Sequence, residues 1–214
     1  MKQNNKVIDY LLMFYFLALS GNPFGSQNIE ISGLITLLFS TPIILKHKKA
    51  LTNRLFLFII FFFLGFEVFH SVIFEVDYFK TIIKIVLLYI FAYALIIRLG
   101  VNFIDVFVKT MVIISLISFL FFILSFIPNV NTFLYELAVR LFPLTPDQNN
   151  YTTPTFIIFT FDPSFINGTT MYPRNAGIFW EAGAFGTFLC MAYFLYLVKK
   201  IPKKISDLFD KNSL

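Results

Sequence analysis

Long apolar runs follow one another along almost the whole chain, and such runs restrict it to membrane-type helices. Six of them cover about residues 7–20, 29–45, 55–74, 79–97, 106–127 and 175–198. A helix needs about 20 mostly apolar residues to cross the hydrocarbon core of a bilayer, so the first run is short and the second marginal. The sequence predicts an all-α integral membrane protein with about six transmembrane helices, forming one polytopic domain over residues 1–214.

The composition agrees with this class and excludes several others. Of the 214 residues, 58% are hydrophobic and 14% are charged, whereas soluble chains have roughly 25% charged residues. A chain this apolar is not disordered. The single cysteine, Cys190, excludes a disulfide framework, and with two histidines it argues against a Cys/His metal site. We therefore expect no structural metal site of this kind.

Lysine and arginine predict the orientation. The net charge is +5, but the basic residues lie in short connections between apolar runs, which indicates membrane topology rather than nucleic-acid binding. With the N-terminus in the cytoplasm, the inner connections and the C-terminal tail are rich in basic residues, and the outer connections are poor in them. The inner basic residues include Lys2, Lys6, Lys46, Lys48, Lys49, Arg54, Arg98, Lys199, Lys200, Lys203 and Lys204. The predicted topology is N-in and C-in, with a long external loop, 128–173, between the fifth and sixth spans.

The first apolar run has a second interpretation. Lys2 and Lys6 precede a short apolar stretch that ends in Ala18-Leu19-Ser20, which is similar to a signal peptide with its cleavage site. We expect a retained helix instead, because the next apolar run begins within ten residues and the chain is polytopic in either case.

The external loop carries its own pattern. Apolar residues recur at helical spacing over 132–142, with Glu136 and Arg140 four residues apart, so the sequence predicts a short amphipathic helix at the membrane surface. Arg140 is the only basic residue of the loop and is a candidate for substrate binding. The rest combines a polar, proline-bearing stretch with turn signals at 162–164. A loop of this length is often functional, although a solvated spacer is a serious alternative.

Ionisable side chains inside spans need a partner or a cavity. Glu67 and His70 are three residues apart and share one face of a helix over 55–74. Lys84 lies at a matching depth in the next run, so Glu67 and Lys84 are expected to meet across two antiparallel helices. A structural ion pair is the favoured explanation, and His70 is expected to be a packing histidine. All three nevertheless remain candidates for substrate binding.

The sixth run contains the most informative stretch. Arg174 stands at its outer boundary, and Glu181 follows seven residues later. Seven residues make nearly two helical turns, so both side chains would lie on one face, with Gly177 between them leaving room for a ligand. An interface anchor and a helix contact would explain Arg174 and Gly177, but not an acid inside a span. We therefore predict Arg174 and Glu181 as catalytic residues and Gly177 as a substrate-binding residue.

This stretch, RNAGIFWEAGAFGTFL, resembles the segment after the main external loop in the O-antigen polymerase and O-antigen ligase superfamily of bacterial inner-membrane enzymes. The matching positions are Arg174, Gly177, Phe179, Glu181 and Gly183. Ala182 stands where proline is common in the family.

The resemblance implies a multi-pass protein of the bacterial inner membrane that transfers a glycan on its periplasmic face. The donor would be a polyprenyl diphosphate-linked glycan, and the acceptor a sugar hydroxyl on a second lipid-linked unit or on lipid A core. Arg174 would hold the diphosphate, and Glu181 would support Arg174 or act as acid or base toward the acceptor. No cofactor is implied. Because family members are longer, this chain is expected to correspond to their N-terminal half.

Two other classes stay open at this stage. One is a non-catalytic or inert membrane protein that packs against other polysaccharide-assembly proteins. The other is a transporter or flippase that uses Glu67, Lys84 and Glu181 as a polar path, although the sequence has no inverted repeat to support it.

Overall fold

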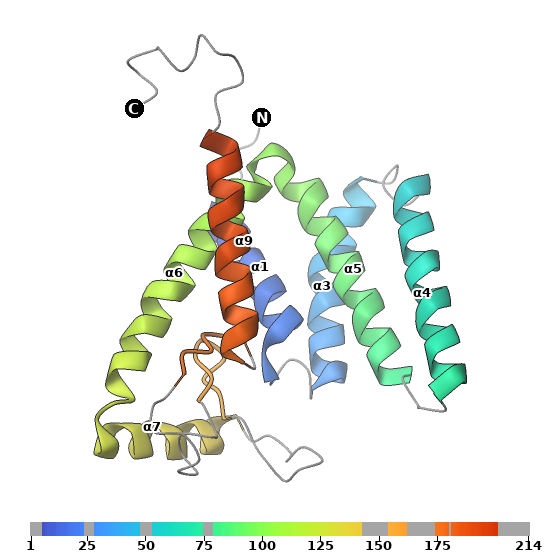
Figure 1. Cartoon of the computed structure of the whole chain (residues 1–214). Helices are drawn as coiled ribbons and strands as arrows, with labels where there is room; N and C mark the ends of the chain where they lie inside the picture. The colour runs from blue at the N-terminus through green and yellow to red at the C-terminus, as the bar shows by residue number, and fades with distance from the viewer. Residues whose placement is uncertain are drawn as a thin grey trace, which may run out of the picture.

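A computed structural model describes residues 6–23, 28–47, 53–74, 79–142, 154–161, 174–179 and 181–200. Helices make up almost all of this part of the chain (Figure 1). An isolated antiparallel bridge between Thr155 and Thr160 lies outside them. The helical elements are α1 (Lys6–Gly21), α3 (Ile29–Lys46), α4 (Arg54–Phe74), α5 (Phe79–Leu99), the 3₁₀ turn η2 (Gly100–Asn102), α6 (Phe103–Leu124), α7 (Pro128–Leu141) and α9 (Ala182–Lys200).

The all-helical prediction is confirmed for these residues. Three helical stretches are long and apolar enough to cross a membrane, namely Arg54–Ile73, Ile85–Leu124 and Ala182–Lys200. The middle stretch contains two helices, α5 and α6, because the chain turns at Gly100, where φ is +51°. These helices are consistent with a membrane-embedded protein, while the count of six spans and the orientation remain predictions.

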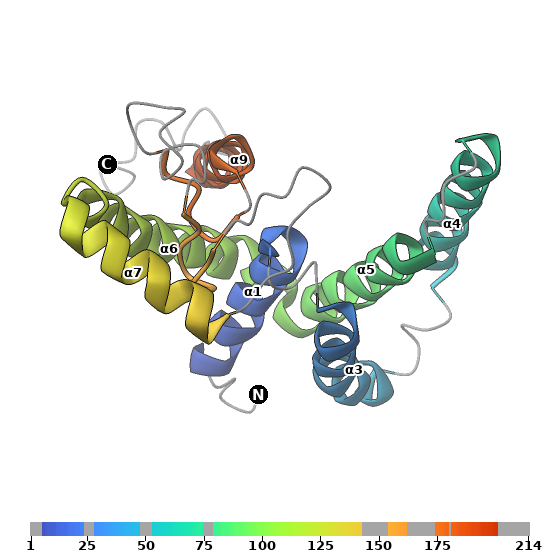
Figure 2. The same ribbon diagram turned by 90° about the horizontal axis from the view of Figure 1, so that it is seen from below.

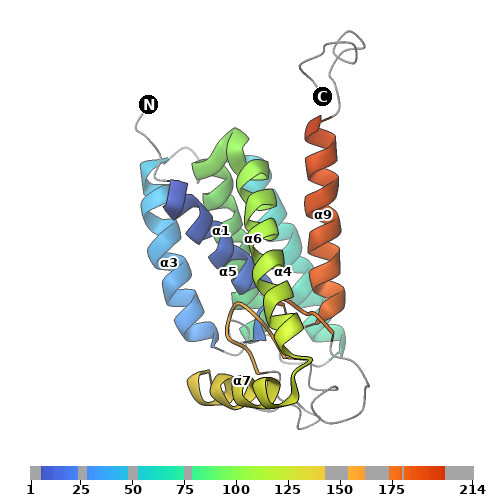
Figure 3. The same cartoon turned by 90° about the vertical axis from the view of Figure 1, so that its left-hand side faces the viewer.

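Successive long helices run in alternating directions, so the molecule has two distinct ends (Figure 1). At one end α1 finishes, α9 begins and α7 lies crosswise beneath the other helices, as Figure 3 shows from the side. We call this the loop end. At the opposite end α1 begins and α9 finishes, and we call it the basic end because most helices there start or stop with a lysine or arginine. These residues are Lys6, Lys46, Arg54, Arg98, Lys199 and Lys200.

The main core lies where α1 meets α5, α6 and α9. Its fully enclosed side chains come from segments far apart in sequence, namely Met13 of α1, Phe91 of α5, Phe107 of α6 and Phe179, which precedes α9. A second, smaller cluster at the loop end joins Ala138 of α7 to two phenylalanines, Phe159 and Phe161.

Helix α3 buries small and hydroxylated residues and exposes its leucines, the reverse of a helix in a soluble protein. The residues that it buries are small or hydroxylated, at Ser32, Gly33, Thr36 and Ser40, whereas its leucines face outward. The hydroxyl of Tyr15 on α1 donates to the carbonyl oxygen of Ser32 at 2.7 Å. Small and hydroxylated interfaces are typical of helices that pack inside a bilayer, where leucine gains nothing by turning inward.

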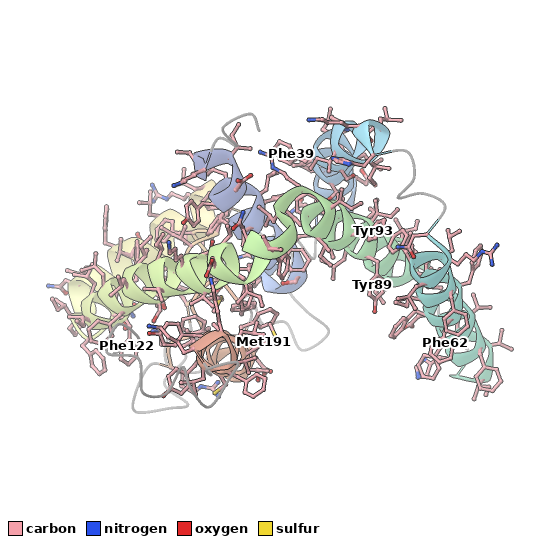
Figure 4. All side chains as sticks on the ribbon, turned by 90° about the horizontal axis from the view of Figure 1, so that it is seen from above. Phe39, Phe62, Tyr89, Tyr93, Phe122 and Met191 are labelled. Carbon is pink, nitrogen blue, oxygen red and sulfur yellow. The ribbon has the colours of Figure 1, made fainter. Side chains whose placement is uncertain are left out.

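Helix α4 extends away from this body, beyond α5 (Figure 2). Every side chain described on it is exposed or half-buried. Its contact with α5 is largely aromatic: Phe56 stacks on Tyr93 with ring centroids 3.7 Å apart, and Phe63 lies 5.2 Å from Tyr89. Figure 4 shows both tyrosines on the stretch of α5 that adjoins α4.

Two predicted helices differ in extent from those in the structure. Helix α7 starts at Pro128 rather than at residue 132, since a proline in the first turn loses no helical hydrogen bond there. Helix α9 begins at Ala182, not at residue 175, so the start of the predicted sixth span is not helical. The turn signals at 162–164 lie outside the described residues.

Candidate functional site

Asn22, directly after α1, anchors the loop end. Its side-chain nitrogen Nδ2 donates to the carbonyl oxygen of Ile178 at 2.8 Å, to that of Ile157 at 3.1 Å and to Thr155 Oγ1 at 3.2 Å. An amide group carries only two N–H hydrogens, so one of them is shared between two acceptors. Asn22 is 2% exposed, and it holds two non-helical segments, 154–161 and 174–179, against the end of α1.

The segment Pro154–Phe161 folds back on itself. The N–H groups of Phe156 and Phe161 donate to the carbonyl oxygens of Phe159 and Pro154, both at 2.9 Å. The hydroxyl of Thr155 accepts from the N–H of Ile157 at 3.0 Å, and both threonines of the bridge are fully buried. These bonds pair several polar groups of the segment within the protein, as non-helical backbone requires wherever water is excluded.

The segment Arg174–Phe179 is fastened at both ends. Asn175 Oδ1 accepts from the hydroxyl of Ser118, in the middle of α6, and from the N–H of Gly177 at 3.0 Å. The carbonyl oxygen of Gly177 accepts from the N–H of Thr160 at 2.7 Å. The two loop segments therefore hydrogen-bond to each other as well as to Asn22.

Both the backbone conformation and the lack of space for a side chain require glycine at position 177. Its φ is +57°, a conformation that side chains disfavour, and a Cβ atom there would lie 2.9 Å from the ring of Phe185. Next to it, Ile178 and Phe179 are completely enclosed in the main core. The glycine allows the chain to turn inward and place these two side chains. The sequence predicted a gap at Gly177 for a ligand or another backbone, and the ring of Phe185 lies on the side where a Cβ would stand.

Glu181 corrects the sequence interpretation most directly. It is exposed and lies just before α9, so it is outside the helix in which the sequence placed it. Its carbonyl oxygen accepts from the N–H of Phe185 at 3.3 Å, as an N-cap residue does. A Cβ on Gly183 would lie 3.6 Å from Glu181 Oε1, so the carboxylate stands over the first turn of α9, where the helix dipole favours a negative charge.

The same-face argument for Arg174 and Glu181 was also wrong, because residues 174–179 do not form a helix. Both side chains are nevertheless exposed, and the buried residues 176–179 lie between them in the chain. A cation and an anion therefore flank a rigidly held segment at one end of the bundle. Arg140 is exposed on α7, which lies at the same end (Figure 1).

The remaining candidates lie elsewhere. Glu67 and His70 are half-buried on α4, and the ring of His70 lies 6.4 Å from that of Phe66. Helices α4 and α9 are on different sides of α5 (Figure 2), so the structure does not bring these residues to Arg174 and Glu181. The side chain of Lys84 is outside the described ones, so its predicted pairing with Glu67 remains untested.

Sequence reasoning missed two polar features. Asn22 appeared to be a plain loop residue, and nothing local marks an amide whose partners lie 133 to 156 residues away. Arg98 was taken only as an orientation signal, yet its Nε donates to Asp9 Oδ1 at 2.7 Å, where α5 ends beside α1. An acid within the first apolar run was the available signal for that ion pair.

No family model, curated protein or solved structure matches this chain. The geometry therefore defines only the class of protein. It is a helical protein of membrane type in which two hydrogen-bonded loop segments are held at one end of the helices.

Proposed function

We propose that the chain is a surface-polysaccharide polymerase or ligase of the O-antigen type. It would transfer a glycan from a polyprenyl diphosphate carrier to a sugar hydroxyl, at the loop end and outside the cytoplasm. The proposal starts from the sequence resemblance around Arg174. The observation that best supports it is the pinned segment Arg174–Phe179, which carries exposed charge at its two borders.

Such a segment suits phosphate chemistry. An arginine can bind diphosphate oxygens with two parallel hydrogen bonds and stabilise the charge that grows on the leaving group. Because Asn175 next to Arg174 is tied to α6, the arginine backbone is fixed before substrate arrives. Preorganised positive charge lowers a barrier more than charge that must first be positioned.

Glu181 is the candidate acid or base. A carboxylate near an acceptor hydroxyl can orient it or take its proton. Its position at the start of α9 also gives it a structural task, since it stabilises the helix terminus. A test must therefore separate the two roles.

The charge distribution supports the proposed orientation. The helix ends at the basic end carry Lys6, Lys46, Arg54, Arg98 and Lys199, which fits a cytoplasmic side. Lys80 and Lys84, near the start of α5, run against this pattern. On this topology the loop end faces the periplasm of a bacterial inner membrane.

The test is the surface-glycan ladder of the source strain. Deletion of the gene should remove long chains or capped core, and the intact 214-residue chain should restore them. Arg174→Ala should abolish the restoration, and Arg174→Lys should leave at most a small fraction because a lysine cannot form two parallel bonds. Arg54→Ala, at the basic end, is the matched control and should restore the ladder fully.

Two further variants separate catalysis from capping at Glu181. Glu181→Asn keeps an N-cap residue but removes the carboxylate, so it should fold and fail to restore the ladder. Glu136→Gln, an exposed glutamate on α7, should behave as the intact chain. An unchanged ladder in the deletion strain would instead favour a non-catalytic membrane subunit. Full activity of Arg174→Ala would remove the site assignment.

A further inference from the structure

A groove runs between α6 and α9 on the outside of the bundle, away from the loop segments. Its volume is about 570 Å³, within the usual range for small-molecule sites. Most of its wall is apolar and comes from Val108, Met111, Val112, Leu116, Leu189 and Ala192.

The charged residues of the groove are confined to one end. Asp105 and Lys109 of α6 and Tyr196 and Lys199 of α9 line it there, at the basic end of the molecule. The Lys199 ammonium group contacts the Asp105 carboxylate across the two helices, and both side chains are about half exposed. Two lysines against one aspartate leave this end with a net positive charge.

Length points to a lipid rather than to a compact ligand. The lining residues of α6 extend from Ile104 to Leu116, which is about 18 Å at 1.5 Å per residue. Half of a bilayer's hydrocarbon core is about 15 Å. The groove therefore reaches from the membrane surface at the basic end to about the middle of the bilayer, the depth of one leaflet.

The charges of the groove favour a lipid as the occupant. Flexible acyl chains adapt to an apolar wall, and the two lysines at one end match the negative charge of a phosphate group. Basic groups between membrane helices are typical of sites for anionic lipid headgroups.

We propose that the α6/α9 groove binds one anionic phospholipid of the leaflet at the basic end. Its acyl chains lie against Val112 and Leu116, and its phosphate lies between Lys109 and Lys199. The phosphate competes with Asp105 for the ammonium group of Lys199. The site is at the opposite end from Arg174 and is independent of the proposed glycosyl transfer.

The test uses the purified full chain in detergent, with native mass spectrometry to count retained lipids. Phosphatidylglycerol and phosphatidylcholine with identical acyl chains are the probes. Phosphatidylglycerol should be retained preferentially, and its affinity should fall about fivefold for each of Lys109→Gln and Lys199→Gln. Lys46→Gln, on the exposed end of α3, is the matched control and should change nothing.

Asp105→Asn acts in a way that misfolding cannot imitate, because it removes the competing carboxylate and should raise phosphatidylglycerol affinity severalfold. Ser115→Trp fills the groove between its apolar walls and should reduce binding of the lipid while leaving the charges in place, with an unchanged circular dichroism spectrum as the control for folding. Soluble glycerol phosphate, which lacks acyl chains, should not displace the lipid.

Three outcomes would overturn the proposal. They are equal retention of the two lipids, an Asp105→Asn variant with unchanged or weaker binding, and a stable dimer that Ser115→Trp disrupts without any effect on lipid retention. The last result would assign the groove to contact between copies of the chain.

Discussion

The loop end of the α1/α6/α9 bundle and helix α4 contain similar apolar residues but differ in which side chains they bury. At the loop end, polar groups such as Asn22 and Thr155 are enclosed and fully bonded, and phenylalanines such as Phe179 pack around them. On α4, phenylalanines such as Phe61 and Phe62 face outward, and no described side chain is buried.

The difference shows that the hydrophobicity of a side chain does not determine whether it is buried in this protein. An outward phenylalanine in lipid is already in an apolar solvent, so burial adds only packing contacts. A polar group without water has no such alternative and must find its partner. The polar residues therefore define the structure of the bundle, whereas α4 is held mainly by ring contacts with α5.

The largest effect is expected at Asn22. Asn22→Leu removes the Asn22 donor from the buried carbonyl oxygen of Ile178 and the part-buried one of Ile157, while Thr155 Oγ1 keeps the N–H of Ile157, so we expect a loss of about 3 kcal/mol at about 1–3 kcal/mol per acceptor. Thermal unfolding in detergent, followed by circular dichroism, measures it. Asn129→Leu, an exposed asparagine on α7, should cost little. Equal costs for the two changes would show that the hydrogen bonds of Asn22 do not hold the loop end.

A pair of phenylalanines tests the comparison directly. Phe91→Ala opens a cavity in the main core, and we expect a cost of about 2–3 kcal/mol, below the soluble-protein range because lipid removes most of the transfer contribution. Phe61→Ala on α4 removes the same atoms from an outward face and should cost less than about 0.5 kcal/mol. The same unfolding experiment compares them. A costly Phe61→Ala would mean that another surface covers α4.

Two glycines extend the comparison to the backbone. Gly177→Ala imposes a left-handed conformation on alanine and pushes on the Phe185 ring, so we expect a cost of about 1–2 kcal/mol. A Cβ on Gly65 of α4 would meet nothing within 4 Å, and Gly65→Ala should stabilise the helix by about 0.5–1 kcal/mol. Opposite signs in the melting temperature are the expected result, and equal shifts would contradict it.

The smallest effects concern ion pairs. Arg98→Met strands the Asp9 carboxylate, whose side chain is 9% exposed, and should cost about 1 kcal/mol since Arg98 itself is partly exposed. Asp105→Asn breaks an exposed pair and should change stability by less than about 0.5 kcal/mol. Chemical denaturation of both variants gives the two values, and the reverse order would mean that burial does not decide the strength of these pairs.

The same contrast explains which features sequence could predict. Within the described residues, the apolar runs located the helices α1, α3, α4, α5, α6 and α9, because a long apolar run has few alternatives to a helix. The predicted start of the sixth helix was wrong because residues 175–179 are apolar enough to suggest a helix, whereas the contacts that hold them in a non-helical conformation come from Asn22 and Ser118. The position of Glu181 was mispredicted for the same reason. The sequence indicated an acid within a helical span, whereas in the structure Glu181 is the residue before α9.

The contacts of Asn22 also have a consequence for biosynthesis. Asn22 emerges early, but Ile178 follows 156 residues later, which takes roughly 8–30 s at the usual rates of translation. During that interval the first helix is in place with its amide still lacking the acceptor on Ile178. The loop end therefore cannot close until Ile178 has been made, after α1, α3, α4, α5, α6 and α7.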